Sequence, residues 1–193
     1  MIDRPILVTG PLRSRNALGA QVPDRRGYMA SPLINAPLPP SWRSDWEDED
    51  LALRMMRGER LSVDSWRIYL NQRQTVSLVL GFQGRYALTG PYLSLDWTRL
   101  LEALEPAKPF VIQTRRRAAD VAASMEAHKQ LSGSDQKEIA AACKKIKPDF
   151  WASYEGAVDD PKRWCASLAK TLMGVDDRSV AAAAALIGPA TSY

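Results

Sequence analysis

Near the start of the chain, a loop that combines arginines with hydroxyl and amide side chains follows the apolar run 6–8 and Thr9. The loop residues are Gly10, Pro11, Leu12, Arg13, Ser14, Arg15 and Asn16. Backbone N–H groups between a strand and a helix converge on one point, and the helix N-terminus adds partial positive charge there. The loop therefore predicts a site for phosphate or sulfate. Arg13 and Arg15 are its candidate catalytic cations.

This loop departs from the common ATP-binding pattern G-x-x-x-x-G-K-[ST]. It keeps Gly10, has Arg15 where a second glycine-like position is expected, and contains no lysine. Arg13 is the substitute cation, because a guanidinium offers a rigid fork to two phosphate oxygens. Ser14 is the hydroxyl that a Mg²⁺ ion would bind. Taken alone, the loop fits equally well a strand, turn and helix whose arginines face water.

A second group of arginines, Arg115 to Arg117, directly follows the strand-like run 110–114. The pattern predicts a strand over 110–114 and a helix from about 118 to 130. Ligands of parallel α/β sheets bind beyond the carboxyl ends of the strands. Arg13 and Arg116 should therefore lie at the same edge of the sheet. The net charge of +4 and the pI of about 9.2 fit a polyanionic partner.

The elements that must position these side chains alternate between strand and helix patterns. Strands are predicted over 6–9, 75–80, 86–91 and 110–114, and helices over 51–57, the part of 65–80 before the strand, 95–104, 118–130, 134–145, 161–172 and 177–186. Such alternation predicts an α/β fold with a mainly parallel sheet flanked by helices. We expect a single domain over 1–193. The proline-rich segment 22–41 is a candidate lid or acceptor-binding loop, since long loops in compact domains tend to be functional.

Composition narrows the class of protein. Apolar residues make up 46% and charged residues 25% of the 193 residues, as in ordinary globular domains. No apolar run reaches the ~20 residues of a membrane span, and the first residues lack a signal-peptide pattern, so we expect a cytoplasmic protein. Cys143 and Cys165 are expected to be buried. A single histidine, His128, argues against a histidine-based zinc site or a Ser-His-Asp triad.

Three segments in order resemble the sulfotransferase-like branch of P-loop proteins. The segment 6–14 looks like that family's strand followed by G-x-[PK]-[RK]-S-G-T. The segment 110–124 looks like a strand followed by R-x-P-x-D-x-x-x-S, in which Arg116, Asp120 and Ser124 hold the spacing and Ala118 replaces the proline. The segment 153–161 is similar to the late Y-E-x-L-x-x-x-P pattern.

This resemblance implies a three-layer P-loop-like fold that binds a donor nucleotide. It implies that Arg116 and Ser124 bind a phosphate of the donor and that the loop cation contacts the transferred group. The altered loop, with Arg15 and Asn16, resembles more closely small P-loop kinases of tailed phages that phosphorylate hydroxymethyluracil in DNA. That likeness implies ATP with Mg²⁺ as donor, DNA with a modified pyrimidine as partner, and the host cytoplasm as location.

Three functions remain open from the sequence. The first is an ATP-dependent kinase for a hydroxyl group, with Asp64 or Glu47 as the acid or base. Trp42, Trp46, Trp66 or Tyr28 could stack on an extruded base, although core packing is the more ordinary role of an aromatic side chain. The second is a metal-independent sulfotransferase that uses phosphoadenosine phosphosulfate. The third is a non-catalytic module that binds a nucleotide or DNA.

Overall fold

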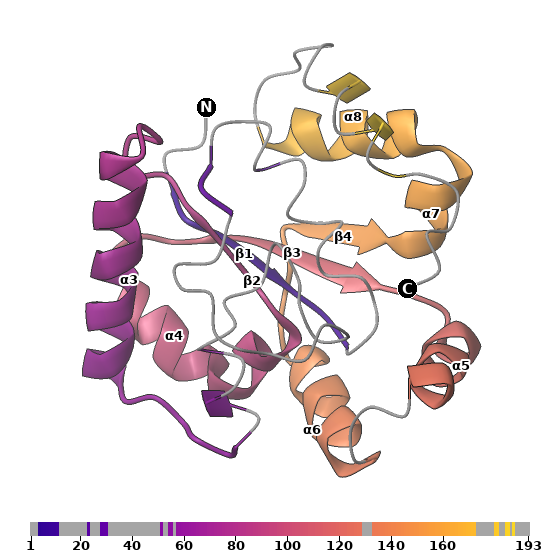
Figure 1. Ribbon diagram of the computed structural model, residues 1–193, viewed down its shortest axis with the longest axis horizontal. Coiled ribbons are helices and arrows are strands. Elements are labelled where there is room, and N and C mark those ends of the chain that lie inside the picture. The colour runs from indigo at the N-terminus through magenta and orange to yellow at the C-terminus, as the bar shows by residue number, and fades with distance from the viewer. Residues whose placement is uncertain are drawn as a thin grey trace.

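The computed structural model describes residues 4–11, 23, 28–30, 51, 54–55, 57–128, 133–172, 180–181, 184–185 and 187. Its centre is a parallel sheet of four strands (Figure 1). The strands are β1 (Ile6–Thr9), β2 (Ala87–Thr89), β3 (Phe110–Arg115) and β4 (Phe150–Ser153), in the order β2-β1-β3-β4.

Helices connect these strands and cover both faces of the sheet. They are α3 (Val63–Val79), the 3₁₀-helix η2 (Pro91–Asp96), α4 (Trp97–Leu104), α5 (Ala118–His128), α6 (Gly133–Cys143), α7 (Tyr154–Asp159) and α8 (Pro161–Thr171). Ser62 caps α3 by accepting a hydrogen bond from the Ser65 N–H at 3.1 Å. Asp160 caps α8 in the same way, through the Arg163 N–H at 3.0 Å.

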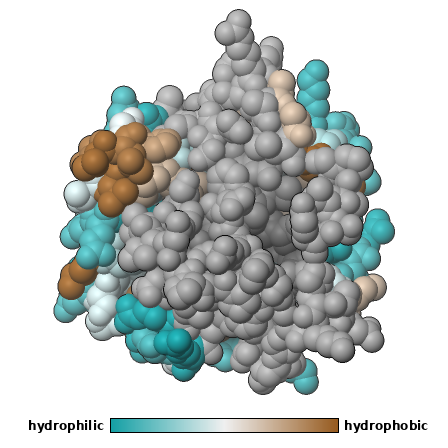
Figure 2. Space-filling model, in the orientation of Figure 1, coloured by the Kyte–Doolittle hydropathy of each residue, from teal (hydrophilic) through white to brown (hydrophobic). Residues whose placement is uncertain are grey.

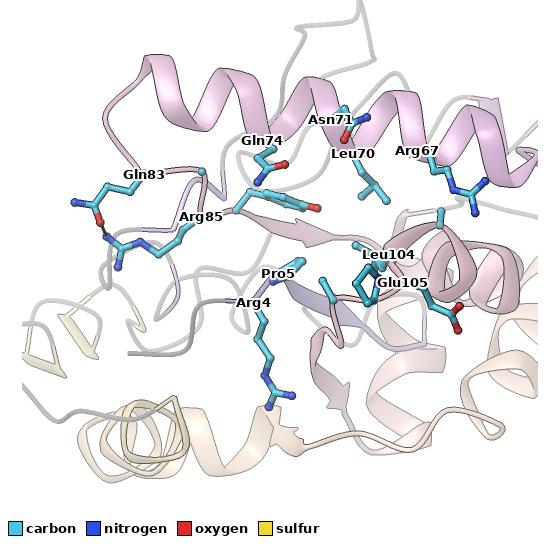
Figure 3. A pocket seen from close by; sticks show the side chains of 15 residues that line it. Arg4, Pro5, Arg67, Leu70, Asn71, Gln74, Gln83, Arg85, Leu104 and Glu105 are labelled. Atoms are coloured by element: carbon cyan, nitrogen blue, oxygen red, sulfur yellow. Dashed lines mark hydrogen bonds between the residues drawn. The ribbon is translucent and has the colours of Figure 1, made fainter.

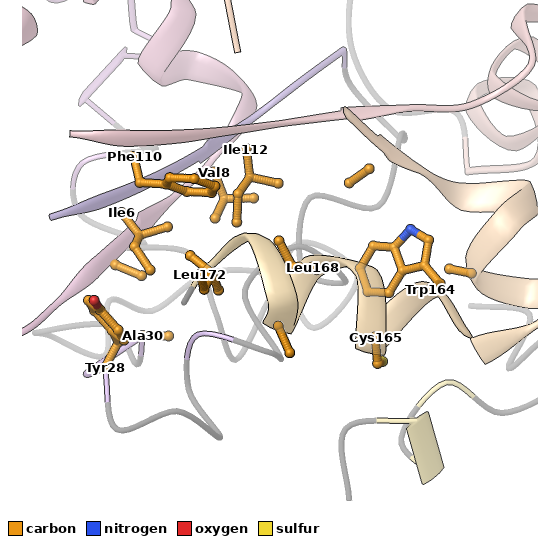
Figure 4. Close-up of a cluster of buried hydrophobic side chains, with 14 of the residues drawn as sticks. Ile6, Val8, Tyr28, Ala30, Phe110, Ile112, Trp164, Cys165, Leu168 and Leu172 are labelled. Carbon is orange, nitrogen blue, oxygen red and sulfur yellow. The ribbon is translucent and has the colours of Figure 1, made fainter. Parts of the chain in front are cut away.

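Successive side chains of β1 enter two separate cores, as the pleat of a strand requires. Ile6 and Val8 pack with Ile112 of β3 and with Leu168 of α8 on one face (Figure 4). Leu7 belongs to the other cluster, which gathers side chains from α3, η2, α4 and α6. A strand buried on both faces needs a continuous apolar run, and this explains the run at 6–8. The predicted three-layer α/β fold is confirmed, and the arrangement is consistent with a P-loop-like fold.

The segment 28–30 extends the sheet beyond β2. The Met29 N–H donates to the Arg85 carbonyl at 3.0 Å, the Ala87 N–H donates to the Met29 carbonyl at 3.0 Å, and the bridge between Met29 and Tyr86 is parallel. Tyr28, Met29 and Ala30 are all buried. These three residues, which fall in the predicted lid 22–41, therefore belong to the sheet and core. A lid role for the rest of that segment stays a prediction, because nearly all of it lies outside the described residues.

The path of the chain reverses at β1. The segment 28–30, which follows β1 in the chain, lies at one edge of the sheet, and β2 lies between that segment and β1. The chain then crosses to the other side of β1, where β3 and β4 lie. Open α/β sheets bind ligands at such a switch point, in the crevice outside the carboxyl ends of the strands. Here that place is the end of β1 and β3.

The predicted strand over 75–80 is wrong, because these residues complete α3 and its C-terminus. Their β-branched and leucine side chains suggested a strand, but Arg73 and Ser77 lie on the buried side of the helix. Several of the apolar side chains face outward instead, with Val79 80% and Leu80 60% exposed. They form the hydrophobic patch over the end of α3 at the upper left of Figure 2.

Other predicted boundaries shift by a few residues. The predicted helix 95–104 is divided into η2 and α4, and Ser134 lies inside α6 rather than at its N-cap. The strand β4 was not predicted. The helix 177–186 falls mostly outside the described residues. Cys143 and Cys165 are buried as predicted. Within the described part of the chain, we find no helix with the length and apolar character that crossing a bilayer requires.

Candidate functional site

The ends of β1, β2 and β3 are tied together at the carboxyl edge of the sheet. The Gly90 N–H donates to the Val8 carbonyl at 3.0 Å, and the Thr114 hydroxyl donates to the Thr9 carbonyl at 3.3 Å. Gly10 and Pro11, the first two residues of the predicted anion-binding loop, leave the sheet directly after this point. The predicted loop therefore begins between two strand ends that hold its backbone in place.

Two threonine hydroxyls at this edge are buried and have no hydrogen-bond partner among the described residues. They are Oγ1 of Thr9, whose residue is 0% exposed, and Oγ1 of Thr89, whose residue is 6% exposed. Thr9 shares a strand face with Leu7, whereas Thr89 pairs in register with Val8 and faces the opposite side. Buried polar side chains are usually hydrogen-bonded. These hydroxyls thus retain hydrogen-bonding capacity beside the start of the loop.

Arg116 lies immediately beyond β3 and stacks on an aromatic ring of the next strand connection. Its Cζ is 4.4 Å from the ring centroid of Tyr154, the first residue of α7. The register explains the contact, because Arg115 is paired with Ser153 and the following residues are then neighbours. The ring contact holds the positively charged guanidinium at this edge of the sheet. Arg116 follows the carboxyl end of a strand, as predicted, and the structure adds that this strand is the neighbour of β1.

Glu155 fixes the backbone of the same turn. Its Oε1 accepts the Arg117 N–H at 2.8 Å, and its Oε2 accepts the Ser153 hydroxyl at 3.0 Å. Partial burial by itself would raise the pKa of Glu155, but these hydrogen bonds and the charge of Arg117 outweigh it and hold the pKa below its ordinary value. The N–H that precedes α5 is therefore already used by a carboxylate. An anionic ligand would bind nearer to β1 and the Arg116 side chain.

The remaining predicted site residues are spread over several elements. Ser124 is half-buried on α5, seven residues beyond Arg117 and therefore on the second turn of the helix. Asp64 lies in the first turn of α3, with its side chain 86% exposed and paired with Arg67 at 3.0 Å. Figure 1 shows α3 well separated from the end of β3, so Asp64 is not brought beside Arg116. That environment is typical of a solvated carboxylate at a helix start, and a catalytic role for Asp64 stays a prediction.

Most of the predicted loop lies outside the described residues, and its contacts remain predictions. This holds for Leu12, Arg13, Ser14, Arg15 and Asn16, and also for Glu47, Trp42 and Trp46. Within the described ranges, no three His, Cys, Asp or Glu side chains come together as metal ligands.

Stacking on a base by Trp66 or Tyr28 is ruled out by their burial. Trp66 is 0% and Tyr28 is 1% exposed, and both pack in the core. The aromatic side chain that the sequence did not single out is Trp151 of β4, which is 49% exposed and lies 5.5 Å from Cζ of Arg115. If 150–153 is taken as a strand, its pleat places Trp151 on the face opposite to Phe150 and Ala152.

A separate cavity of about 560 Å³ lies at the amino edge of the sheet, between α3 and the residues before β1 and β2 (Figure 3). Its polar lining includes Arg4, Asn71, Gln74 and Arg85. Arg85 is engaged with Gln83 Oε1 at 2.6 Å. The cavity is lined by none of the predicted site residues that the structure describes, so it is distinct from the carboxyl edge.

Comparisons of the chain with protein-family models, with curated proteins and with solved structures found no match.

Proposed function

We propose that this protein is a P-loop kinase that transfers a phosphoryl group from ATP to a hydroxyl group, with the hydroxymethyl group of 5-hydroxymethyluracil in DNA as acceptor. One observation carries the proposal. Arg116, stacked on Tyr154, stands next to the end of β1 at the switch point of the sheet. A cation at that crevice, beside a strand end that leads into an arginine-rich loop, is suited to the phosphates of a nucleotide.

Each group at the edge has a role in this reaction. Arg116 and Ser124 hold a donor phosphate, and the backbone from Gly10 to Asn16 surrounds the transferred group. Arg13 and Arg15 neutralise the charge that moves to the leaving group. Phosphoryl transfer depends chiefly on such positioning and charge stabilisation. The acceptor oxygen forms the new bond to phosphorus as the bond to the ADP oxygen breaks, and the hydroxyl proton passes to a carboxylate base. Glu47 is the remaining candidate for this base, because Asp64 is exposed and paired with Arg67.

The available side chains fit the phosphate part of the donor better than they fit a protein cage for a metal. Arg116 places a cation at the strand end, and Ser14 is the predicted ligand of Mg²⁺. When bound, Mg²⁺ would neutralise charge on the phosphates, and it commonly needs only one or two protein ligands beside them.

A second candidate function is sulfuryl transfer from phosphoadenosine phosphosulfate. The residues that follow two of the strands favour this function. β2 continues into Gly90 and Pro91, and β3 continues into Arg116 and Arg117. Neither of these strand ends carries a carboxylate that could hold a metal. Sulfuryl transfer needs no metal ion, and the same Arg116 would hold the donor phosphate.

A transfer assay separates these functions. Purified protein is mixed with γ-labelled ATP or with ³⁵S-labelled phosphosulfate donor and with duplex DNA containing 5-hydroxymethyluracil. The kinase predicts label in DNA from ATP only when Mg²⁺ is added, and the sulfotransferase predicts label from the sulfate donor in a chelator. Binding of a nucleotide without transfer of either label would identify a non-catalytic module.

Controls distinguish the site from the rest of the chain. DNA with thymine in place of 5-hydroxymethyluracil should accept no label. Arg116→Ala should abolish transfer with the fold retained, and Arg13→Ala should do the same. Lys108→Ala, which removes one exposed positive charge at the amino edge, should transfer like wild type. Undiminished transfer in Arg116→Ala would overturn the proposed site.

A further inference from the structure

The described part of the chain has one aromatic side chain with about half of its surface exposed, and it lies close to the proposed site. Trp151 is 49% exposed on β4, and Cζ of Arg115 lies 5.5 Å from its ring centroid. Trp66, Phe110 and Trp164 are buried, and the other described aromatics are buried or partly buried. An exposed indole that is not used in a core, accompanied by an arginine, is an arrangement that single-stranded nucleic acid binders use to stack bases.

Trp151 and Arg115 lie next to Arg116 in the chain and the sheet, but on the opposite face of the sheet from the Arg116 side chain. Trp151 pairs in register with Gln113, whose side chain faces the α6 side through a hydrogen bond to the Cys143 carbonyl at 2.8 Å. Tyr154, whose ring contacts the guanidinium of Arg116, packs instead against the core on the α8 side. The consecutive residues Arg115 and Arg116 therefore contact two different aromatic rings, which lie on opposite faces of the sheet.

We propose that Trp151 and Arg115 form a stacking platform for an unpaired nucleobase of the acceptor strand. The proposal rests on the proposed function and adds the place where the acceptor is held. A base inside a duplex cannot reach an active site and must be extruded before reaction, and an extruded base or its unpaired partner offers a planar face. The indole stacks on that face, and the arginine run 115–117 attracts the flanking phosphates.

Charge complementarity favours nucleic acid as the occupant of this surface. Arg115 lies beside the exposed ring and two further arginines follow it in the chain, whereas the nearby carboxylate of Glu155 is held by the Arg117 N–H and Ser153. A strand of nucleic acid presents a phosphate with every base, so one ligand satisfies both the ring and the arginines. The adenine of the donor is the other planar group in the reaction that could stack on Trp151. A titration with ATP distinguishes stacking of adenine from stacking of an acceptor base.

The test compares a labelled oligothymidylate, an abasic oligonucleotide of equal length, and ATP, each titrated into wild type and Trp151→Leu. Fluorescence anisotropy follows the oligonucleotides, and calorimetry follows ATP. Trp151→Leu should weaken oligothymidylate binding by about 5- to 150-fold, the range for loss of one base–aromatic stack. Binding of the abasic strand and of ATP should not change. Trp151→Phe, which keeps a ring, should recover most of the affinity.

Salt dependence separates stacking from charge. Arg115→Ala should reduce the slope of log affinity against log salt by about 0.7, the value for one phosphate contact on a single strand. Trp151→Leu should lower affinity at every salt concentration without changing the slope. Leu80→Ala, at the exposed end of α3, is the matched control for removal of surface apolar area and should bind like wild type.

Each remaining outcome has a definite meaning. Equal oligothymidylate binding by wild type and Trp151→Leu overturns the platform, and so does a loss that affects the abasic strand equally. A loss of ATP affinity in Trp151→Leu, with oligothymidylate binding intact, assigns the ring to adenine and also overturns it. If wild type binds no ATP and transfers no label, yet its oligothymidylate binding depends on Trp151, the proposed kinase fails and the platform stands.

Discussion

The guanidinium of Arg116 lies over the ring of Tyr154, with 4.4 Å between Cζ and the ring centroid. The two residues are 38 positions apart in the chain, and they meet because β3 and β4 are parallel neighbours in register. The contact aligns the side chain of an arginine that would otherwise be free to adopt many rotamers at the end of a strand. Nucleotide affinity and the pH dependence of stability should both be sensitive to this turn.

Replacement of Tyr154 by Leu should weaken nucleotide binding. The effect is indirect, because Tyr154 positions Arg116 and does not itself contact the nucleotide. The ring contributes about 0.5–1 kcal/mol through its interaction with a partly exposed cation, so a 2- to 5-fold lower affinity for ATP is expected by calorimetry. Tyr154→Phe keeps the ring and should bind like wild type.

The coupling of Tyr154 to Arg116 is measured by a double-mutant cycle. In the Arg116→Ala background, Tyr154→Leu should have no further effect on ATP affinity, because the cation that the ring positions has gone. Additive losses would show that Tyr154 affects binding by another route, such as general stability.

Glu155 should stabilise the fold in a manner that depends on pH. Hydrogen bonds from Arg117 and Ser153 lower its pKa in the folded protein below the ordinary 4.5. The contribution is therefore complete above the unfolded pKa and is lost as the pH falls through the lower folded pKa. Urea unfolding should show Glu155→Gln less stable than wild type at pH 7, by under about 1 kcal/mol because the carboxylate is partly exposed.

At pH 3 the difference between Glu155→Gln and wild type should be smaller than at pH 7. Asp159→Asn removes an exposed charge from the same helix and controls for net charge. A difference that grows on acidification would contradict a lowered pKa for Glu155 in the folded protein.

The buried hydroxyls of Thr9 and Thr89 should be dispensable for folding. Neither has a hydrogen-bond partner within the described ranges, so Thr9→Val or Thr89→Val removes a polar atom that burial penalises and preserves the shape of the side chain. The free energy of unfolding should stay unchanged or rise by up to about 1 kcal/mol. Thr114→Val is the contrast, because the Thr114 hydroxyl donates to the Thr9 carbonyl, and its loss should cost about 1 kcal/mol. Equal destabilisation by all three substitutions in urea titrations would contradict the conclusion that the Thr9 and Thr89 hydroxyls make no stabilising hydrogen bond.

The two cysteine thiols should be inert in the native protein. Burial raises the pKa of Cys165 to about 11, and it also raises the pKa of Cys143, against opposing hydrogen bonds from Ser94 and Gln113. Thiolate is the reactive form, so a chromogenic thiol reagent at pH 8 should react with both thiols only after urea is added. Rapid reaction of either thiol in native buffer would contradict the buried placement.

Local pattern was enough to predict much of the fold. The run Ile6-Leu7-Val8 predicts a strand covered on both faces, and 110–114 predicts a second strand with arginines at its carboxyl end. Helical spacing and proline breaks locate α5 and α8 to within a few residues. The pattern failed at 75–80, because β-branched residues are tolerated at the exposed end of a helix that Ser62 has already started. It also failed at 150–153, where a short edge strand has little periodicity to detect.

For the candidate site, the sequence by itself determined which chemistry is present: an arginine-rich loop after the first strand, and Arg116 after another. Only the tertiary structure decided that β1 and β3 are adjacent, that Arg116 stacks on Tyr154 while Glu155 occupies the Arg117 N–H, and that Trp151 is exposed whereas Trp66 is buried. The physical reason is that residue type and spacing act locally along the chain. Strand order and register depend on which apolar faces the whole chain can bury together, and this is settled only when the sheet and both helical layers have assembled.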